Sequence, residues 1–387
     1  MTGFAPALPP PRREAPEVRG ESPIRVLIVD DSAVVRGLLS RLVAEQPDLE
    51  VAATAANGQM ALNAIAAGNV DVVVLDIEMP VMDGLSALPR LLAADPELRI
   101  IIASTLSTPG AAVTMRALAA GASDYVAKPS ASRGITQAGS ANSDFRRDLL
   151  TKIRSLGEAG RRRRRRIVSP AAAATSPAAK PSAPGIVLRP LRAVRPEVIV
   201  IGSSTGGPQA LSTLILGLGR DVAQPLLIVQ HMPPTFTTIL AEHLARVSGR
   251  PCAEAADGEP IQPGRMYVAP GDHHMLVEAD GRRRLIRINR EAPENFCRPA
   301  VDVLFRSAAR VYGGETLAVV LTGIGADGTR GGRDIVEADG ALLAQDEASS
   351  VVWGMPGSVA RAGLCSAVLP LPALARQINQ IAGGARS

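Results

Sequence analysis

The chain has 387 residues, a formal net charge of +5, 46% hydrophobic residues, 2% aromatic residues and three cysteines. This length predicts more than one domain, and the scarcity of aromatic residues leaves Ala, Val, Leu and Ile to build cores suited to buried parallel strands. The composition excludes a general polycation, a disulfide framework and a CxxC zinc site, and no run of about 18 apolar residues is present to span a membrane.

The start of the chain and the cysteines indicate the compartment. Residues Met1–Glu21 are rich in Pro and charge and lack the apolar core of a signal peptide. Cys252, Cys297 and Cys365 lie far apart, as reduced thiols of an intracellular protein do. We therefore expect a soluble cytoplasmic protein that is not a membrane protein, with a disordered tail at residues 1–22.

Short apolar runs alternate with helical patterns over residues 23–158. Apolar residues recur at helical spacing in Ala33–Gln46 and Leu85–Ala94, and a final helix is predicted at Ser143–Leu156 behind a Ser/Asp cap. Five such βα units predict a doubly wound parallel sheet. The predicted strands are Ile24–Val29, Leu49–Ala53, Val70–Leu75, Arg99–Ala103 and Tyr125–Val126.

Residues 159–195 have a different composition, in which the Arg161–Arg166 run precedes a Pro-, Ala- and Ser-rich stretch. Such a stretch cannot bury a core and is typical of a semi-extended linker. Six arginines can bind nucleic acid or anionic lipid. No aromatic residues for base stacking accompany them, so we favour a solvated tether and expect no nucleic-acid partner.

Alternation resumes over residues 196–387, where VIVIG, LLIVQH and LAVVLTG each end in polar or Gly-rich residues. A second open α/β sheet is predicted, which would be a Rossmann-like parallel sheet. In such sheets the site forms where several strands end at their carboxyl edge.

Five polar residues follow the predicted strands of the first sheet. Asp30 and Asp31 close the first strand and Asp76 closes the third, so three carboxylates meet at one edge. Clustered carboxylates need a cation, and hard oxygen ligands favour Mg²⁺, which would neutralise charge as a phosphoryl group moves onto an aspartate. Ser104 supplies a hydroxyl and Lys128 a positive charge at the same edge.

The second sheet predicts a nucleophile. Ser204 lies in a G-x-S-x-G turn between a strand and a helix predicted at Pro208–Leu218, where backbone N–H groups can receive a developing oxyanion. His231 follows the strand LLIVQ and can take the serine proton, and Asp327 follows LAVVL and can orient the imidazole. The order Ser, His, Asp differs from that of the α/β-hydrolase fold, so the turn does not predict that fold.

Each part of this second site has an alternative. The Gly-Ser-Ser-Thr-Gly-Gly turn can also bind phosphate. His273 and His274 are rivals for the base, whereas His243 lies in a helical pattern and is interpreted as structural. The Gly323-x-Gly325-x-x-Gly328 spacing matches the dinucleotide fingerprint, without a complete early βαβ unit around it.

The first half resembles the receiver domain of two-component response regulators, which is flavodoxin-like. VDDS, LDIEMPVMDG and the Lys-Pro pair carry this resemblance, from roughly Ile24 to Leu156. It implies Asp76 as the phosphoacceptor and Mg²⁺ held by Asp76, Asp30, Asp31 and the backbone of Glu78. It also implies Ser104 as the switch hydroxyl and Lys128 as the phosphate-contacting cation.

The second half resembles the chemotaxis protein-glutamate methylesterase family from about residue 196 to the C-terminus, through GSSTGGP, QHMPP, VAPGDHH, RPAVDVLF, LTGIGADG and QDEASSVVWGMPG. This implies Ser204 as nucleophile, His231 as base and Asp327 as the orienting carboxylate. Oxyanion donors would be the backbone of Thr205, Gly206 and Ile324, the last at a position where members often carry Met.

The two resemblances together imply an enzyme activated by phosphorylation. It would hydrolyse glutamate γ-methyl esters on methylated, membrane-bound chemoreceptors, release methanol, and deamidate receptor glutamines as a secondary activity. A chemotaxis-type histidine kinase would be the phosphodonor, and the esterase domain would need no cofactor. The alternatives from other classes are a nucleic-acid-binding output through the Arg run and a catalytically silent interaction module.

Overall fold

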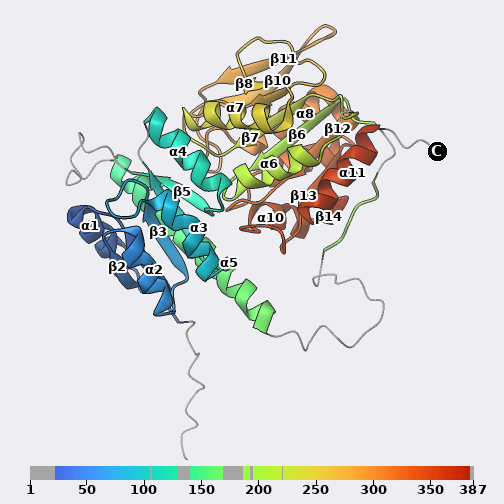
Figure 1. Cartoon of the computed structure of the whole chain (residues 1–387). Helices are drawn as coiled ribbons and strands as arrows, with labels where there is room; N and C mark the ends of the chain where they lie inside the picture. The colour runs from blue at the N-terminus through green and yellow to red at the C-terminus, as the bar shows by residue number, and fades with distance from the viewer. Residues whose placement is uncertain are drawn as a thin grey trace, which may run out of the picture.

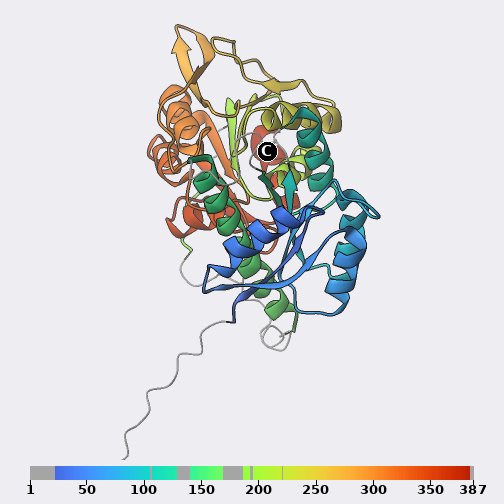
Figure 2. The ribbon, with the colours of Figure 1, turned by 90° about the vertical axis from the view of Figure 1, so that its left-hand side faces the viewer.

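The computed structural model describes residues 22–104, 107–128, 140–168, 186–191, 195–219 and 221–383. These residues form two α/β units that lie side by side, with the N-terminal unit in blue to green and the C-terminal unit in yellow-green to red (Figures 1 and 2). Within the described ranges, no helix is both long enough and apolar enough to cross a bilayer. The predicted tail up to residue 21 lies outside these ranges.

The N-terminal unit is a five-stranded parallel sheet of order β2-β1-β3-β4-β5, covered by helices on both faces as predicted (Figure 1). Observed strand bounds differ from the predicted ones by at most two residues at either end. The strands are β1 Ile24–Val29, β2 Leu49–Ala55, β3 Val72–Asp76, β4 Arg99–Ser104 and β5 Asp124–Ala127. The helices are α1 Ala33–Ala44, α2 Gly58–Ala66, α3 Gly84–Ala94, α4 Thr108–Ala119 and α5 Ser140–Val168.

Short polar side chains begin the helices of this unit. At the N-termini of α1 to α4, the caps Ser32, Asn57, Asp83 and Ser107 each accept a hydrogen bond from a backbone N–H three residues on. Capping of this kind satisfies donors that the first helical turn leaves free. Helix α1 therefore starts directly after Asp30 and Asp31, which follow β1.

Helix α5 differs from the prediction, because it continues through the arginine run instead of ending at Leu156. The Arg161 guanidinium lies 2.6 Å from the Asp71 carboxylate, and that of Arg164 lies 3.2 Å from it. Arg163 lies 2.9 Å from Glu97. The interpretation of this run as a solvated, self-repelling tether is therefore wrong.

The physical reason is that arginine is a good helix former once its charge is compensated. Carboxylates at the start of the strands and at the ends of neighbouring loops supply that compensation, and these pairs occupy guanidinium groups that nucleic-acid binding would need. The remainder of the predicted linker lies largely outside the described residues, in ranges 169–185 and 192–194.

The C-terminal unit is a seven-stranded parallel sheet of order β14-β13-β12-β6-β7-β9-β8, with an antiparallel hairpin of β10 and β11 beside it (Figure 1). The central strand β6 pairs with β12 on one side and β7 on the other, which confirms the predicted Rossmann-like arrangement. The strands are β6 Val198–Ser203, β7 Leu226–Gln230, β8 Cys252–Glu254, β9 Met266–Val268, β10 His274–Asp280, β11 Arg283–Asn289, β12 Thr316–Val320, β13 Ala341–Gln345 and β14 Ala367–Leu369. The helices are α6 Gly207–Gly217, α7 Phe236–Ser248, α8 Val301–Tyr312, α9 Thr329–Glu337, α10 Met355–Arg361 and α11 Leu371–Gly383, with the short 3₁₀ turn η2 at Gly313–Glu315.

The two units share an apolar interface. Helix α4 packs against α7 and α6, and the Tyr125 ring of β5 stacks on Phe236 of α7 with ring centroids 4.6 Å apart. Gln209 of α6 donates to the carbonyls of Leu118 and Ala122, each at 2.5 Å. One buried hydrophobic cluster runs through both units, so they pack against each other through a shared apolar interior.

Candidate phosphoacceptor site and candidate active site

Three carboxylates gather where β1 and β3 end. Asp30 and Asp31 follow β1, Asp76 is the last residue of β3, and one ligand atom from each lies within 4.8 Å of the others. Asp30 and Asp76 are buried while Asp31 is exposed. The site is therefore open to solvent on one side and enclosed by the sheet on the other.

Lys128 compensates part of this charge from the end of β5. Its ammonium lies 2.7 Å from Asp30 and 2.8 Å from Asp76. Burial raises the pKa of Asp76, and Lys128 only partly offsets the effect. For Lys128 itself, burial is outweighed by Asp76 and Asp30, so its pKa is raised. One lysine for three carboxylates leaves net negative charge in the cluster.

The donor set fits Mg²⁺, because close carboxylate oxygens with excess negative charge are the ligands this hard cation prefers. Glu78, whose backbone is expected to hold the same ion, lies exposed two residues beyond Asp76. Ser104 is buried one position beyond Ala103, which pairs in register with Asp76, and its hydroxyl donates to the Gly110 carbonyl at 3.2 Å. All six sequence-predicted residues thus lie at this one edge of the sheet.

Ser204 occupies the turn between β6 and α6. Its carbonyl accepts from the Gln230 side-chain amide at 2.9 Å, which ties it to the end of β7. The turn requires glycines: Gly206 has φ 75°, and a Cβ at Gly207 would meet the Gln230 oxygen at 1.8 Å. A Cβ at Gly323 would meet the Ser204 Cβ at 2.8 Å, so Gly323 is explained by its closeness to the serine rather than by a dinucleotide.

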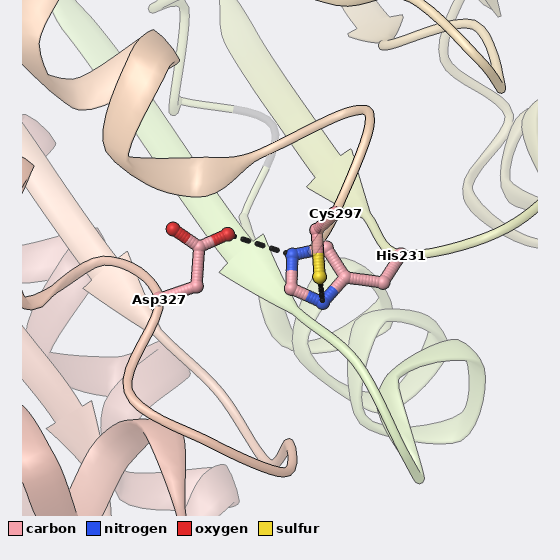
Figure 3. Close-up of side chains that lie close together, drawn as sticks. All are labelled: His231, Cys297 and Asp327. Atoms are coloured by element: carbon pink, nitrogen blue, oxygen red, sulfur yellow. Dashed lines mark hydrogen bonds and ion pairs between the residues drawn. The ribbon is translucent and has the colours of Figure 1, made fainter. Parts of the chain in front are cut away.

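His231 and Asp327 form a direct pair (Figure 3). His231 follows β7, Asp327 follows β12, and the His231 Nε2 lies 2.8 Å from an Asp327 carboxylate oxygen. The backbone N–H groups of Val301 and Asp302, in the first turn of α8, donate to the same carboxylate at 2.7 and 3.0 Å. Burial alone would raise the pKa of Asp327, but the imidazole and these N–H groups lower it to about 2. Asp327 is therefore held ionised at a helix N-terminus.

The other imidazole nitrogen faces a thiol. The Cys297 Sγ lies 3.4 Å from the His231 Nδ1 (Figure 3). Burial disfavours the imidazolium, but Cys297 and Asp327 outweigh burial and raise the pKa of His231 to about 10. Among the described residues, the Ser204 hydroxyl has no hydrogen-bond partner. In this arrangement the imidazole is paired with the thiol rather than with the serine.

The three predicted oxyanion donors surround Ser204. Thr205 and Gly206 follow it directly, and Ile324 follows Gly323, whose backbone abuts the serine. Within the described part of the chain, the backbone N–H groups of all three have no intramolecular acceptor. Free N–H groups beside a nucleophile are what an oxyanion requires.

The rival histidines have other partners. His274 is buried, and its ring bonds the Ala292 carbonyl and the Ala300 N–H. His273 Nδ1 lies 3.1 Å from the Gly271 carbonyl. His243 in α7 contacts the Ser212 hydroxyl, as a structural residue would. Of the four, His231 is the one that contacts Asp327.

Three residues of this site were missed by sequence reasoning. The Asn295 amide donates to Asp302 at 2.8 Å and to Asp327 at 2.9 Å, bridging two carboxylates. Burial, together with Asp327, raises the pKa of Asp302. Asn295 and Cys297 lie in a loop without strand or helix periodicity, so no pattern indicated them. Asp302 belongs to the RPAVDVLF motif, but nothing in that motif indicated that it lies beside Asp327.

An acidic cluster with a lysine on a doubly wound sheet, joined to a second sheet that carries Ser204, His231 and Asp327 at one edge, is typical of a response regulator with a hydrolase output. Residues 26–139 match the family described as response regulator receiver domain, and residues 199–378 match the family described as CheB methylesterase. The chain belongs to the CheB methylesterase family of receiver-linked enzymes.

Named relatives cover nearly the whole chain. A protein-glutamate methylesterase/protein-glutamine glutaminase 1 of Rhodospirillum rubrum is 53% identical and covers 92% of this chain and 94% of its own. A protein of Azospirillum brasilense called protein-glutamate methylesterase/protein-glutamine glutaminase is 50% identical over 99% of each. The crystal structure of the Thermotoga maritima CheB methylesterase catalytic domain is 40% identical, covering 48% of this chain and 98% of that chain with a TM-score of 0.47.

Proposed function

We propose that this protein hydrolyses glutamate γ-methyl esters on chemoreceptors, releases methanol, and deamidates receptor glutamines by the same route. The observation that carries the proposal is the His231–Asp327 pair, which follows β7 and β12, with Ser204 directly after β6, the strand between them. The names of relatives similar over nearly the whole chain support the substrate class. The amide is a secondary substrate because it is a poorer electrophile than the ester.

The triad works through the Nδ1 of His231, because Asp327 occupies the other nitrogen. The Ser204 oxygen attacks the ester carbonyl while Nδ1 takes its proton, and the Asp327 carboxylate stabilises the imidazolium that results. Backbone N–H groups of Thr205, Gly206 and Ile324 receive the oxyanion; losing one such donor costs about 10²–10³ in rate in serine hydrolases. The imidazolium then protonates departing methanol, and water hydrolyses the acyl-enzyme. With Cys297 beside it the pKa of His231 is about 10, so the imidazole has to lose its Nδ1 proton, and Cys297 has to release Nδ1, before this cycle can begin.

The N-terminal sheet supplies the switch. Asp76 accepts a phosphoryl group from a chemotaxis-type histidine kinase, and Mg²⁺, held by Asp30, Asp31, Asp76 and the Glu78 backbone, would offset negative charge during transfer. Ser104 and Lys128 then contact the phosphoryl oxygens. We place the protein in the cytoplasm, where its kinase and the cytoplasmic parts of membrane receptors meet it.

For domain boundaries we propose a receiver domain from residue 23 and a methylesterase domain from residue 196. The linker begins after α5 at Val168 rather than at residue 159. In the described arrangement, the receiver holds a residue of the active-site turn: the Thr205 hydroxyl donates to Asp124 of β5 at 2.5 Å. Lys152 of α5 lies 3.6 Å from the same carboxylate. This contact ties the oxyanion turn to the face of the receiver and gives the unphosphorylated state its low activity.

Methanol release from receptor-containing membranes methylated on glutamate tests the activity. Wild type is compared with Ser204→Ala, each with and without a small phosphodonor and Mg²⁺. We expect release that depends on Ser204 and rises with the phosphodonor. Absence of release from wild type under both conditions would contradict the proposed reaction.

Gln209→Ala tests the switch separately. Loss of its two hydrogen bonds to the receiver should weaken the closed arrangement by about 1–2 kcal/mol, which corresponds to a rise in basal rate of about five- to thirtyfold. Gln59→Ala, at an exposed position of α2, is the matched control and should leave the basal rate unchanged. Equal basal rates for both variants and wild type would exclude restraint through this interface.

A further inference from the structure

The Cys297 thiol and the Ser204 hydroxyl compete for one nitrogen. Asp327 holds the Nε2 of His231 at 2.8 Å, so only Nδ1 is left to accept a proton from a nucleophile. The Cys297 sulfur lies 3.4 Å from that Nδ1 (Figure 3). A group attached to this sulfur would therefore stand where serine and ester must approach the base.

The thiol is held in place by a two-residue turn. The backbone N–H of Cys297 donates to the Glu294 carbonyl at 2.9 Å, and that of Glu294 donates back at 3.1 Å. The central residues Asn295 and Phe296 have φ of 53° and 62°, a conformation that costs energy for residues other than glycine. The Asn295 amide anchors this turn to Asp302 and Asp327. The turn and its anchor thus hold the Cys297 sulfur next to the His231 imidazole.

The other two cysteines lie in different surroundings. Burial raises the pKa of Cys252 and of Cys365 to about 12, so both remain thiols at neutral pH. Cys297 is partly exposed and, unlike them, contacts an imidazole. An imidazole in contact with a thiol can act as a base when that thiol attacks an electrophile. Cys297 is therefore the cysteine set up for reaction with an electrophile.

We propose that Cys297 is a modification site at which a low-molecular-weight disulfide, such as glutathione disulfide, reversibly shuts off the hydrolase. The Cys297 sulfur attacks one sulfur of the disulfide, a new S–S bond forms as the old one breaks, and the departing thiolate takes the proton released from Cys297. A second thiol reverses the exchange. The inference rests on the proposed function in one respect, namely that His231 serves Ser204 as base.

The test treats the full-length protein with glutathione disulfide and measures two independent quantities. Intact mass and peptide mapping locate the added group, and methanol release from methylated receptor membranes is measured before treatment, after it, and after dithiothreitol. The variants are Cys297→Ser, which keeps a small polar side chain in the turn, and Cys252→Ser as the matched control. Each is compared with its own untreated sample.

We expect wild type and Cys252→Ser to gain one glutathione at Cys297, lose at least tenfold in rate, and recover with dithiothreitol. Cys297→Ser should keep its own rate throughout. The proposal is overturned by labelling elsewhere, by labelling of Cys297 with no loss of rate, or by equal inhibition of Cys297→Ser. If untreated wild type releases no methanol, the proposed function fails and this inference falls with it, whatever the mass shows.

Discussion

Asp76 and Asp327 each lie at the carboxyl edge of a parallel sheet, Asp76 as the last residue of β3 and Asp327 in the loop after β12, yet their pKa values are displaced in opposite directions. Burial raises the pKa of Asp76, which lies beside Asp30 and gains only partial relief from Lys128. Asp327 is also buried, but His231 and two N–H groups of α8 lower its pKa to about 2.

The difference shows that the sheet edge fixes the position of each aspartate, whereas the neighbouring groups determine how its carboxylate ionises. Around Asp76 the excess negative charge favours a cation and a group transferred to the carboxylate. Around Asp327 a helix N-terminus and an imidazole stabilise the anion, so it serves as a permanent counter-charge. The same residue type therefore has opposite electrostatic surroundings in the two units, which suit the proposed roles of phosphoacceptor and orienting carboxylate.

The largest expected effect separates the two aspartates by activity. Asp327→Asn should lower the rate of methanol release by about 10⁴-fold, as loss of the triad carboxylate does in serine proteases, because the imidazole loses its anionic partner. Phosphorylation of Asp76 by a small phosphodonor, measured by mass, should be unchanged in this variant. A loss below tenfold would show that Asp327 is not the orienting carboxylate.

Asn295 tests whether support for Asp327 extends beyond α8. Asn295→Ala removes its hydrogen bonds to two carboxylates and should lower kcat by at least about tenfold, since a hydrogen bond to a charged group is worth about 1.5–3 kcal/mol. Asn295→Asp should lower kcat further, because it places a third carboxylate beside Asp302 and Asp327. Equal kcat for wild type and both variants would show that Asn295 does not position Asp327. The dependence of kcat on pH distinguishes a positioning role from unfolding, because a variant that only unfolds should keep the wild-type profile.

Stability at neutral pH should move in opposite directions for the two aspartates. A lowered pKa contributes stability above the ordinary value of 3.8 that is lost as pH falls through about 2, so Asp327→Asn should cost about 2 kcal/mol at pH 7. The raised pKa of Asp76 contributes stability only at low pH, and that contribution is lost as pH rises through the folded-state value. Asp76→Asn should therefore stabilise the receiver at pH 7 without Mg²⁺.

Amide hydrogen exchange of peptides from β3 and β12 measures these changes in each unit separately. Wild type at the same pH is the reference, and adding Mg²⁺ should remove the advantage of Asp76→Asn. A shift of the same sign in both variants would refute the contrast between the two sites.

The smallest expected effect concerns the arginine run. Arg161→Ala should destabilise the receiver by about 1–2 kcal/mol, because the partly buried Asp71 loses its closest guanidinium. Arg162→Ala is the matched control: its contact with Glu158 is exposed on both sides, and such pairs contribute about 0–1 kcal/mol. Hydrogen exchange of the β3 amides measures the stability of the receiver in both variants. Identical protection in the two variants would indicate that the arginine run is a simple tether.

Much of this molecule follows from local pattern. Apolar runs such as Ile24–Val29 and VIVIG became the predicted parallel strands. The candidate site residues Asp76, Ser204 and His231 were recognisable because each lies within two residues of the end of such a run. The end of α5 was missed because its arginines carry no apolar periodicity, and only distant carboxylates such as Asp71 make that helix stable.

The sequence by itself determined the two sheets and the strand ends at which the aspartates, serine and histidine lie. The reason is that apolar residues recur every two residues in half-buried strands and every 3.6 residues in helices. Tertiary structure alone decided how those groups ionise and which of them meet. The approach of Cys297 and Asn295 to the His231–Asp327 pair, and of Asp124 to Thr205, depends on contacts between segments far apart in the chain. Charge and hydrogen bonding act over a few ångströms of space, and no local sequence pattern encodes that distance.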